Sequence, residues 1–418
     1  MSLIDIAMVG RLGAAAVAAV GLGGMLTYTV SAFLNAIQAG VQTIVARRVG
    51  EGRHLDAAAA VRSSLYFALV TGSIFAALFI WTTRHLLPAI NPDQQVVAIG
   101  TAYVNMRGLS LGLVMAGYVF YAFYNGISQT RVHMIVSIVS NTLNVVLNYG
   151  LIFGRLGLPE LGAPGAGLAT TLSSAVAFTL YALFTRTARI QSQYPGLWRG
   201  PRETGTLTRI LKLALPASIQ NFGVMIGFSV FIVIMGWVST VALAATEIVI
   251  NILSLSFMPA NGFLYATQTL VSESMGRGQY RDAEASTSTA TWLCILLMGT
   301  MGIIFILVPQ HILQMFTPDK AIITAGTMPL RILGLVQFFD AVGMVHHGAL
   351  RGAGDNVFPA VVDLMLMWLI FLPITYTTSI RLDWGIVGGW IALAVYIVGY
   401  AILAYSRFRY GPWKRLVI

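Results

Sequence analysis

Charged residues are scarce in this chain of 418 residues: only 10% are charged, whereas 57% are hydrophobic. Typical soluble domains contain about 25% charged residues, so the shortage excludes an ordinary soluble fold. A single cysteine, Cys294, excludes an internal disulfide. The opening residues lack the basic start of a secretory signal and include Asp5, so none is expected. A mean hydropathy of +0.78 indicates a polytopic membrane protein.

Eleven apolar runs reach the length of about 20 residues that spans a bilayer. They are 14–39, 57–82, 97–124, 132–153, 163–185, 210–236, 241–266, 286–308, 324–350, 357–379 and 385–406. The first nine residues resemble the end of one more helix, but nine residues cover only about 13 Å of a core about 30 Å thick. We therefore expect a truncated first helix, with a naturally short, non-spanning start as the alternative.

The basic residues predict the orientation. Most of the 25 Lys and Arg residues fall on the side that carries the loop 40–56, and an excess of positive charge marks the cytoplasmic side. This places the linker and the C-terminus in the cytoplasm, in a multi-pass protein of the inner membrane. The net charge of +10 is then an orientation signal, and no nucleic-acid partner is expected.

The chain contains an internal repeat. The segment VARRVGEGRHLDAA (45–58) recurs as VSESMGRGQYRDAE (271–284), and Pro92-Asp93 recurs as Pro318-Asp319 in the same register. The shift contains an even number of spans, so both copies cross the membrane in the same sense. We predict an all-α fold of two parallel six-helix bundles related by a pseudo-two-fold axis along the membrane normal. The expected division is an N-lobe 1–188, a cytoplasmic linker 189–208 and a C-lobe 209–418.

The repeat separates scaffold from candidate site. Repeated glycines at loop positions are most simply structural, for positive φ or close backbone approach. The acids within the apolar segments, Asp5, Glu247 and Asp340, have no acidic counterpart in the other copy. An ionisable residue at membrane depth is a functional-site hypothesis by default.

In the first lobe, polar residues follow one face of the predicted helix 132–153. Asn141, Asn144 and Asn148 lie three and four residues apart, and Asp5 lies near the end of the first helix. A carboxylate that faces amide side chains can bind a proton. It can also bind a sodium ion through the carboxylate and amide oxygens, because hard cations prefer oxygen ligands. The alternative is helix–helix adhesion by asparagine hydrogen bonds.

In the second lobe, Gln337, Asp340, Met344 and His347 share one helical face. This polar face should look into the protein and not at lipid. Glu247 begins a second stripe, with Asn251 one turn later. Two acids in one apolar bundle repel each other when both are charged, so each favours the protonated form of the other. A carboxylate of this kind can carry a proton near neutral pH.

Other residues are candidates for substrate contact. Aromatic walls with one or two carboxylates suit flat, lipophilic cations, although ordinary helix packing is the alternative for any one aromatic residue. The adjacent His346 and His347 make a poor metal pair, and no metal-ligand motif is present. The candidates for substrate binding are Asn141, Asn251, Gln337, Tyr121 and Asp363.

Several stretches resemble the multidrug and toxin extrusion (MATE) family. They are DIAMVGRLGAAAVAAVGL (5–22), the GxxxxVARRVGEG segment (40–52), NVVLNYGLIFG (144–154), LPASIQ (215–220) and QFFDAVGMVHHGALRGAGD (337–355). The resemblance covers both lobes and implies twelve helices around a V-shaped cavity. It also implies export of organic cations and drugs in exchange for sodium or protons. Asp5 matches the family's acid in helix 1, and Asp340 matches its acid in helix 10.

The chain departs from the family pattern at three positions. Many members carry a glutamate in helix 7, where this chain has Val224, and they usually carry glutamine at Glu247. We therefore hypothesise that Glu247 replaces the missing acid. Asn148 stands where some archaeal members have aspartate. The expected ion-coupling residues are Asp5, Asn144, Asn148, Glu247 and Asp340, with a possible Na⁺ site at Asp5 or Asp340.

The sequence predicts a secondary active antiporter that works by alternating access. A lipid-linked saccharide flippase of the same superfamily is the alternative, but only Arg107 and Arg331 lie within spans, which disfavours an anionic phosphate substrate. A membrane enzyme would need a catalytic cluster, and none is visible. We expect no cofactor beyond a coupling ion, Na⁺ or H⁺, and a monomer that binds small organic cations within the lipid bilayer.

Overall fold

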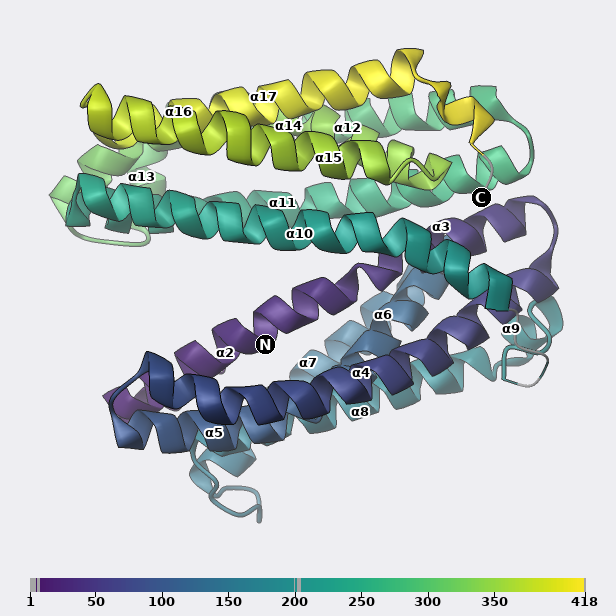
Figure 1. Ribbon diagram of the computed structural model, residues 1–418, viewed down its shortest axis with the longest axis horizontal. Helices are drawn as coiled ribbons and strands as arrows, with labels where there is room; N and C mark the ends of the chain where they lie inside the picture. Colours follow the sequence, from purple (N-terminus) through teal and green to yellow (C-terminus); the bar gives the residue numbers. More distant parts are fainter. Residues whose placement is uncertain (1–4, 6–7, 199, 201–203, 417–418) are drawn as a thin grey trace. The chain divides into compact units, whose positions relative to one another are not determined.

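The computed structural model describes residue 5, residues 8–198, residue 200 and residues 204–416. These residues form helices and connecting turns, with no β-strand among them (Figure 1). The longer helices are α2 (Ala14–Asn35), α3 (Ile37–Gly50), α4 (His54–Ile90), α5 (Gln94–Gly108), α6 (Leu111–Gly126), α7 (Thr130–Phe153), α8 (Ala163–Thr185), α10 (Thr204–Val238), α11 (Thr240–Gly276), α12 (Tyr280–Leu307), α14 (Lys320–Ala353), α15 (Val357–Met365) and α17 (Gly385–Tyr410). Short helices are α9 (Ala188–Gln193), α13 (Pro309–Gln314) and α16 (Leu372–Tyr376).

Ten of the eleven predicted spans are confirmed. Within the described part of the chain, ten helices are long and apolar enough to cross a membrane, and the predicted span 97–124 is divided between α5 and α6, a pair bent by 43° that makes eleven when it is counted as one span. The chain is therefore a multi-pass membrane protein. The helices are longer than the apolar runs: α11 continues ten residues past 266 to Gly276. The first predicted helix falls mostly on residues 1–4 and 6–7, which lie outside the described residues.

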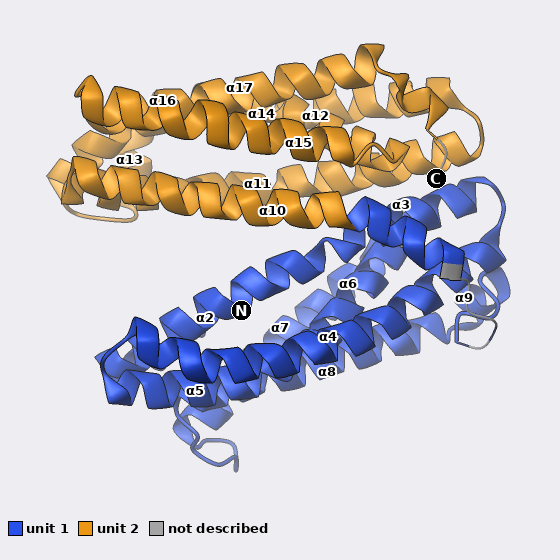
Figure 2. Cartoon of the chain, viewed as in Figure 1, with its two compact units in different colours: residues 1–214 blue, residues 215–418 orange. Residues whose placement is uncertain are grey.

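The chain divides into two compact units, residues 1–214 and 215–418, shown in blue and orange in Figure 2. In unit 1, α3 packs against α4 and α6, α2 against α5, and α8 against α5 and α7. In unit 2, the central helix α14 packs against α11, α12 and α17. The helix pairs inside unit 1 therefore correspond to helix pairs inside unit 2, as the repeat predicts.

The repeated residues occupy equivalent positions inside their own units. Asp93 caps α5 and Asp319 caps α14, each accepting a backbone hydrogen bond of 2.8 Å from the residue two positions later. Gly52 has φ = 73° and Gly278 has φ = 72°, which L side chains rarely adopt. The expectation of positive φ at these scaffold glycines is confirmed.

Close helix contact explains a further repeated glycine. A Cβ atom added to Gly352 of α14 would lie 2.4 Å from the backbone oxygen of Gln268 on α11. The equivalent Cβ on Gly126 of α6 would lie 3.2 Å from the backbone oxygen of Gln42 on α3. Glycine lets both helix pairs approach until backbones nearly touch.

Helix α15 does not continue regularly to the end of its span. Two π-helical stretches, Leu366–Phe371 and Thr377–Arg381, flank α16. Such segments are rare and often lie at functional sites. Asp363 precedes the first one by three residues.

Candidate functional site

The first polar cluster surrounds Asp5, which is 1% exposed. The Asn148 side-chain amide donates a hydrogen bond of 2.6 Å to Asp5 Oδ1 and one of 3.3 Å to Asn144 Oδ1. Both asparagines are fully buried. The structure thus brings together three of the five predicted ion-coupling residues, from the N-terminal segment and α7.

Arg107 completes this cluster. Its guanidinium Nη1 lies 3.8 Å from Asp5 Oδ2 and donates a hydrogen bond of 3.2 Å to Thr170 Oγ1 on α8. Asn144 also donates to Thr170, over 3.4 Å. We did not predict a role for Arg107 or Thr170 from the sequence. The available signal was the rarity of an arginine within a span.

Asn141 and Tyr121 lie outside the Asp5 cluster. The exposed Asn141 side chain donates to the backbone oxygen of Ser137 in its own helix, at 2.7 Å. The Tyr121 ring meets His133 edge-on, with centroids 4.0 Å apart, and His133 is hydrogen-bonded to Tyr181. The predicted α7 stripe therefore divides into a buried part at Asn144 and Asn148 and an exposed part at Asn141.

In unit 2, the predicted polar face of α14 is turned into the protein. Gln337 is fully buried and donates a hydrogen bond of 2.8 Å to Ser256 Oγ on α11. Asp340 is half-buried. Its Oδ2 atom is buried and has no hydrogen-bond partner among the described residues, and the same is true of Gln337 Oε1. Two oxygen acceptors one turn apart are thus left without donors.

Glu247 and Asn251 lie on an exposed face of α11. The Asn251 amide donates to the backbone oxygen of Glu247, at 2.9 Å. Between the described residues, no hydrogen bond or ion pair joins Glu247 to Asp340. The structure therefore does not bring the two acids of the second lobe into contact.

Asp363 is the centre of a second buried cluster in unit 2. Gln220 Nε2 on α10 donates a hydrogen bond of 2.7 Å to Asp363 Oδ2, and the Tyr396 hydroxyl on α17 donates to Oδ1. Arg351 on α14 donates to Gln220 Oε1 over 3.1 Å. Three helices thus meet at one carboxylate, and α14 joins the cluster through Gln220. The Arg351 residue is only 8% exposed, and Gln220 provides it with a polar partner.

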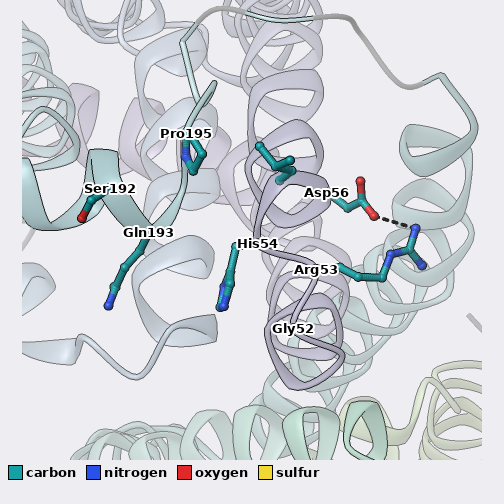
Figure 3. Close-up of a pocket in the computed structure, with 8 residues that line it drawn as sticks. Gly52, Arg53, His54, Asp56, Ser192, Gln193 and Pro195 are labelled. Atoms are coloured by element: carbon teal, nitrogen blue, oxygen red, sulfur yellow. Dashed lines mark ion pairs between the residues drawn. The ribbon is translucent and has the colours of Figure 1, made fainter.

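A cavity of about 390 Å³ lies elsewhere in unit 1. It is lined by the α3–α4 loop, the start of α4, the end of α9 and Pro195, with an ion pair between Arg53 and Asp56 at its edge (Figure 3). None of the predicted site residues lines it. Across the described residues, no group of three His, Cys, Asp or Glu is arranged to hold a metal ion.

Among the described residues, ten or eleven membrane spans in two internally similar units, with buried carboxylates at Asp5 and Asp363, are typical of a membrane transporter. The MatE family model matches residues 1–150 and 216–377, and the chain belongs to this family. The probable multidrug resistance protein NorM of Thermotoga maritima is 31% identical over 423 residues, covering 100% of this chain and 89% of that protein. The multidrug resistance protein PmpM of Pseudomonas aeruginosa is 28% identical, covering 97% and 86%.

Solved structures agree with the fold. A crystal structure of MATE in the straight conformation has a TM-score of 0.90 with 20% identity, covering 99% of this chain and 92% of that chain. A MOP superfamily transporter from Pyrococcus furiosus has a TM-score of 0.86 with 19% identity, covering 97% and 90%. The predicted family and all-α fold are confirmed.

Proposed function

We propose that this chain is a secondary active efflux transporter, which exports organic cations and drugs in exchange for Na⁺ or H⁺. The names of the relatives as multidrug resistance proteins support the substrate class. In this proposal, two lobes (residues 1–188 and 209–418) alternate access across the inner membrane. The linker and the C-terminus face the cytoplasm, and the protein acts as a monomer.

The observation that carries the proposal is the unpartnered carboxylate oxygen of Asp340. A buried acceptor without a donor costs about 1–3 kcal/mol, and more when it is charged. Binding of a proton or of Na⁺ removes this cost, and an approaching organic cation competes for the same charge. Gln337 Oε1, also unpartnered, supplies a second oxygen ligand one turn away. Exchange of an ion for a cationic substrate at Asp340 follows from this competition.

The remaining candidates take roles that fit their surroundings. Asp5, with Asn144 and Asn148, is the proposed ion-coupling group of the first lobe. Glu247 remains a proposed ion-coupling residue, and its exposed position suits the first capture of a cation. The proposed substrate contacts are Asn141, Asn251, Gln337 and Tyr121.

Asp363 needs a different role from the predicted substrate contact. It is 8% exposed, and both its carboxylate oxygens already accept hydrogen bonds. A substrate would have to open this network before it could touch the carboxylate.

A flippase for anionic lipid-linked sugars is less well supported. Such a substrate needs free cationic side chains in the spans. Arg107 is paired with Asp5, and Arg331 lies on an exposed face of α14.

Ethidium efflux tests the proposed function. Cells or inverted vesicles that carry the wild-type protein, Asp340→Asn or Asp5→Asn are given a sodium gradient or a pH gradient separately. We expect one gradient to drive wild-type efflux and at least one variant to lose it at normal membrane abundance. If neither gradient moves dye through the wild-type protein, multidrug antiport is wrong.

A further inference from the structure

A buried polar ladder runs through unit 2 from Asp340 towards the end of α14. Along this helix, Gly343, His347 and Arg351 follow Asp340 at helical spacing on the side that faces α17. The Tyr400 ring contacts His347, with centroids 5.7 Å apart. It also lies 3.4 Å from the position of a Cβ on Gly343. From Asp340 to Arg351 the helix rises about 16 Å, half the thickness of a bilayer core.

Tyr396 connects the two acids of this ladder. It lies on α17 one turn before Tyr400, and its hydroxyl donates to Asp363 Oδ1. Because α14 and α17 run in the same direction, with Arg407 bonded to Asp355 at their ends, Tyr396 lies beside the turn of α14 before Gly343, which carries Asp340. Asp340 Oδ2 is the unpartnered end of the ladder, whereas Asp363 is the fully hydrogen-bonded end.

The charged and titratable groups around both ends belong to several helices. Arg351 and His347 face the Asp363 end from α14, Tyr396 and Tyr400 from α17, and Tyr265 of α11 lies near Arg351. Cys294 of α12 and Tyr396 lie near Asp340. Arg351 is the one cation in this set, and through Gln220 it is bound on the side of Asp363 away from Tyr396.

We propose that Tyr396 and Asp363 form a proton relay between Asp340 and the end of unit 2 that carries Arg351. This inference rests on the proposed function, since it supplies the exit route of a coupling proton. An antiporter whose central acid releases a proton to the cytoplasm needs polar groups in that direction. Chains of acidic and polar side chains serve this purpose in pumps and transporters.

The transfer step conserves protons and charge. In the proposed step, the proton of Asp340 moves through water to the hydroxyl oxygen of Tyr396. The phenolic proton of Tyr396 moves at the same time along the existing hydrogen bond to Asp363 Oδ1. Asp340 becomes a carboxylate, Tyr396 stays neutral and Asp363 becomes a carboxylic acid. The nearby guanidinium of Arg351 then favours the return of Asp363 to its carboxylate form, and the proton passes to water on the cytoplasmic side.

The π-helical stretch after Asp363 fits this role. Leu366–Phe371 begins three residues beyond the carboxylate, and a π-helix interrupts the regular α-helical hydrogen bonds. Asp363 thus lies at the end of a rigid α-helical segment, where a change in its protonation alters the bonds to α10 and α17 together.

The test separates net proton-coupled transport from substrate exchange. The purified full chain is reconstituted into liposomes, and two rates are measured: ethidium efflux driven by a pH gradient, and ethidium–ethidium counterflow at equal pH, which needs no net proton movement. The variants are Tyr396→Phe and Asp363→Asn. The matched control is Tyr405→Phe, which removes an exposed hydroxyl from the same helix.

We expect Tyr396→Phe to lower gradient-driven efflux by about tenfold or more with counterflow close to wild type, because a positioned proton-transfer group contributes about 10²–10⁴-fold in rate. Its melting temperature should fall, because Asp363 Oδ1 loses its donor. Asp363→Asn should behave alike, and Tyr405→Phe like wild type. Wild-type gradient-driven efflux in Tyr396→Phe overturns the relay. So does an equal loss of gradient-driven efflux and counterflow, which marks a structural role. Wild-type counterflow without any response to a pH gradient instead refutes proton antiport itself.

Discussion

Removal of the Arg107 guanidinium should destabilise unit 1, because it leaves the buried carboxylate of Asp5 without its cation. The two charged groups are 3.8 Å apart, and their side chains are 15% and 2% exposed. At that separation the attraction is about 4 kcal/mol for an effective dielectric constant of about 20. Measured losses on breaking a buried pair, about 3–5 kcal/mol, agree. We therefore expect Arg107→Met to lower the free energy of unfolding by about 4 kcal/mol.

A double-mutant cycle tests this reasoning. Unfolding of the purified protein in detergent is followed by tryptophan fluorescence for Arg107→Met, Asp5→Asn and the double variant. The double variant should recover at least about half of the loss, since neither partner then remains charged and unpaired. Arg331→Met is the control, because this span arginine is exposed, and it should cost below about 1 kcal/mol. If the double variant is no more stable than Arg107→Met, the ion pair does not hold unit 1 together.

Two further predictions concern packing and the linker. Gly348→Ala should destabilise unit 2 by about 1–3 kcal/mol, because its Cβ would lie 2.2 Å from the backbone oxygen of Leu264. Gly262→Ala, with open space around its Cβ, is the matched control, and equal melting temperatures would contradict the close approach of α11 and α14. Trp198→Phe removes the 2.8 Å hydrogen bond to Thr185, worth about 1 kcal/mol. Limited trypsin digestion should then cut the linker faster, and an unchanged rate would show that this bond does not secure it.

The scaffold could be predicted from sequence because its signals are local. The caps at Asp93 and Asp319 need only a side-chain oxygen two residues before an amide. The glycines of the repeated loops need only a backbone angle. Apolar length alone placed ten spans, but it did not show the bend between α5 and α6. The helix extensions beyond the apolar runs were missed because polar helix ends leave no apolar signal.

The site could be predicted only in part. Spacing along one helix grouped the buried asparagines of α7. Asp5 was added to them as an acid within an apolar segment and by the family resemblance. The stripe that begins at Glu247 had equally good spacing, yet it is exposed. Spacing shows which residues share a face of a helix, but not which neighbour that face meets. The rotation of each helix is fixed by packing, which a single sequence does not display.

By itself, the sequence determined the membrane class, the position of most spans and the duplication of the scaffold. The physical reason is that a hydrocarbon core accepts only apolar segments of about 20 residues whose backbone groups are bonded internally. Only the tertiary structure decided which polar side chains meet the buried carboxylates. Asp5 bonds Asn148, and Asp363 bonds Gln220, in each case across 143 residues of chain. Such pairs depend on helix rotation and on distances of a few ångströms, because hydrogen bonds and buried ion pairs fade beyond that range.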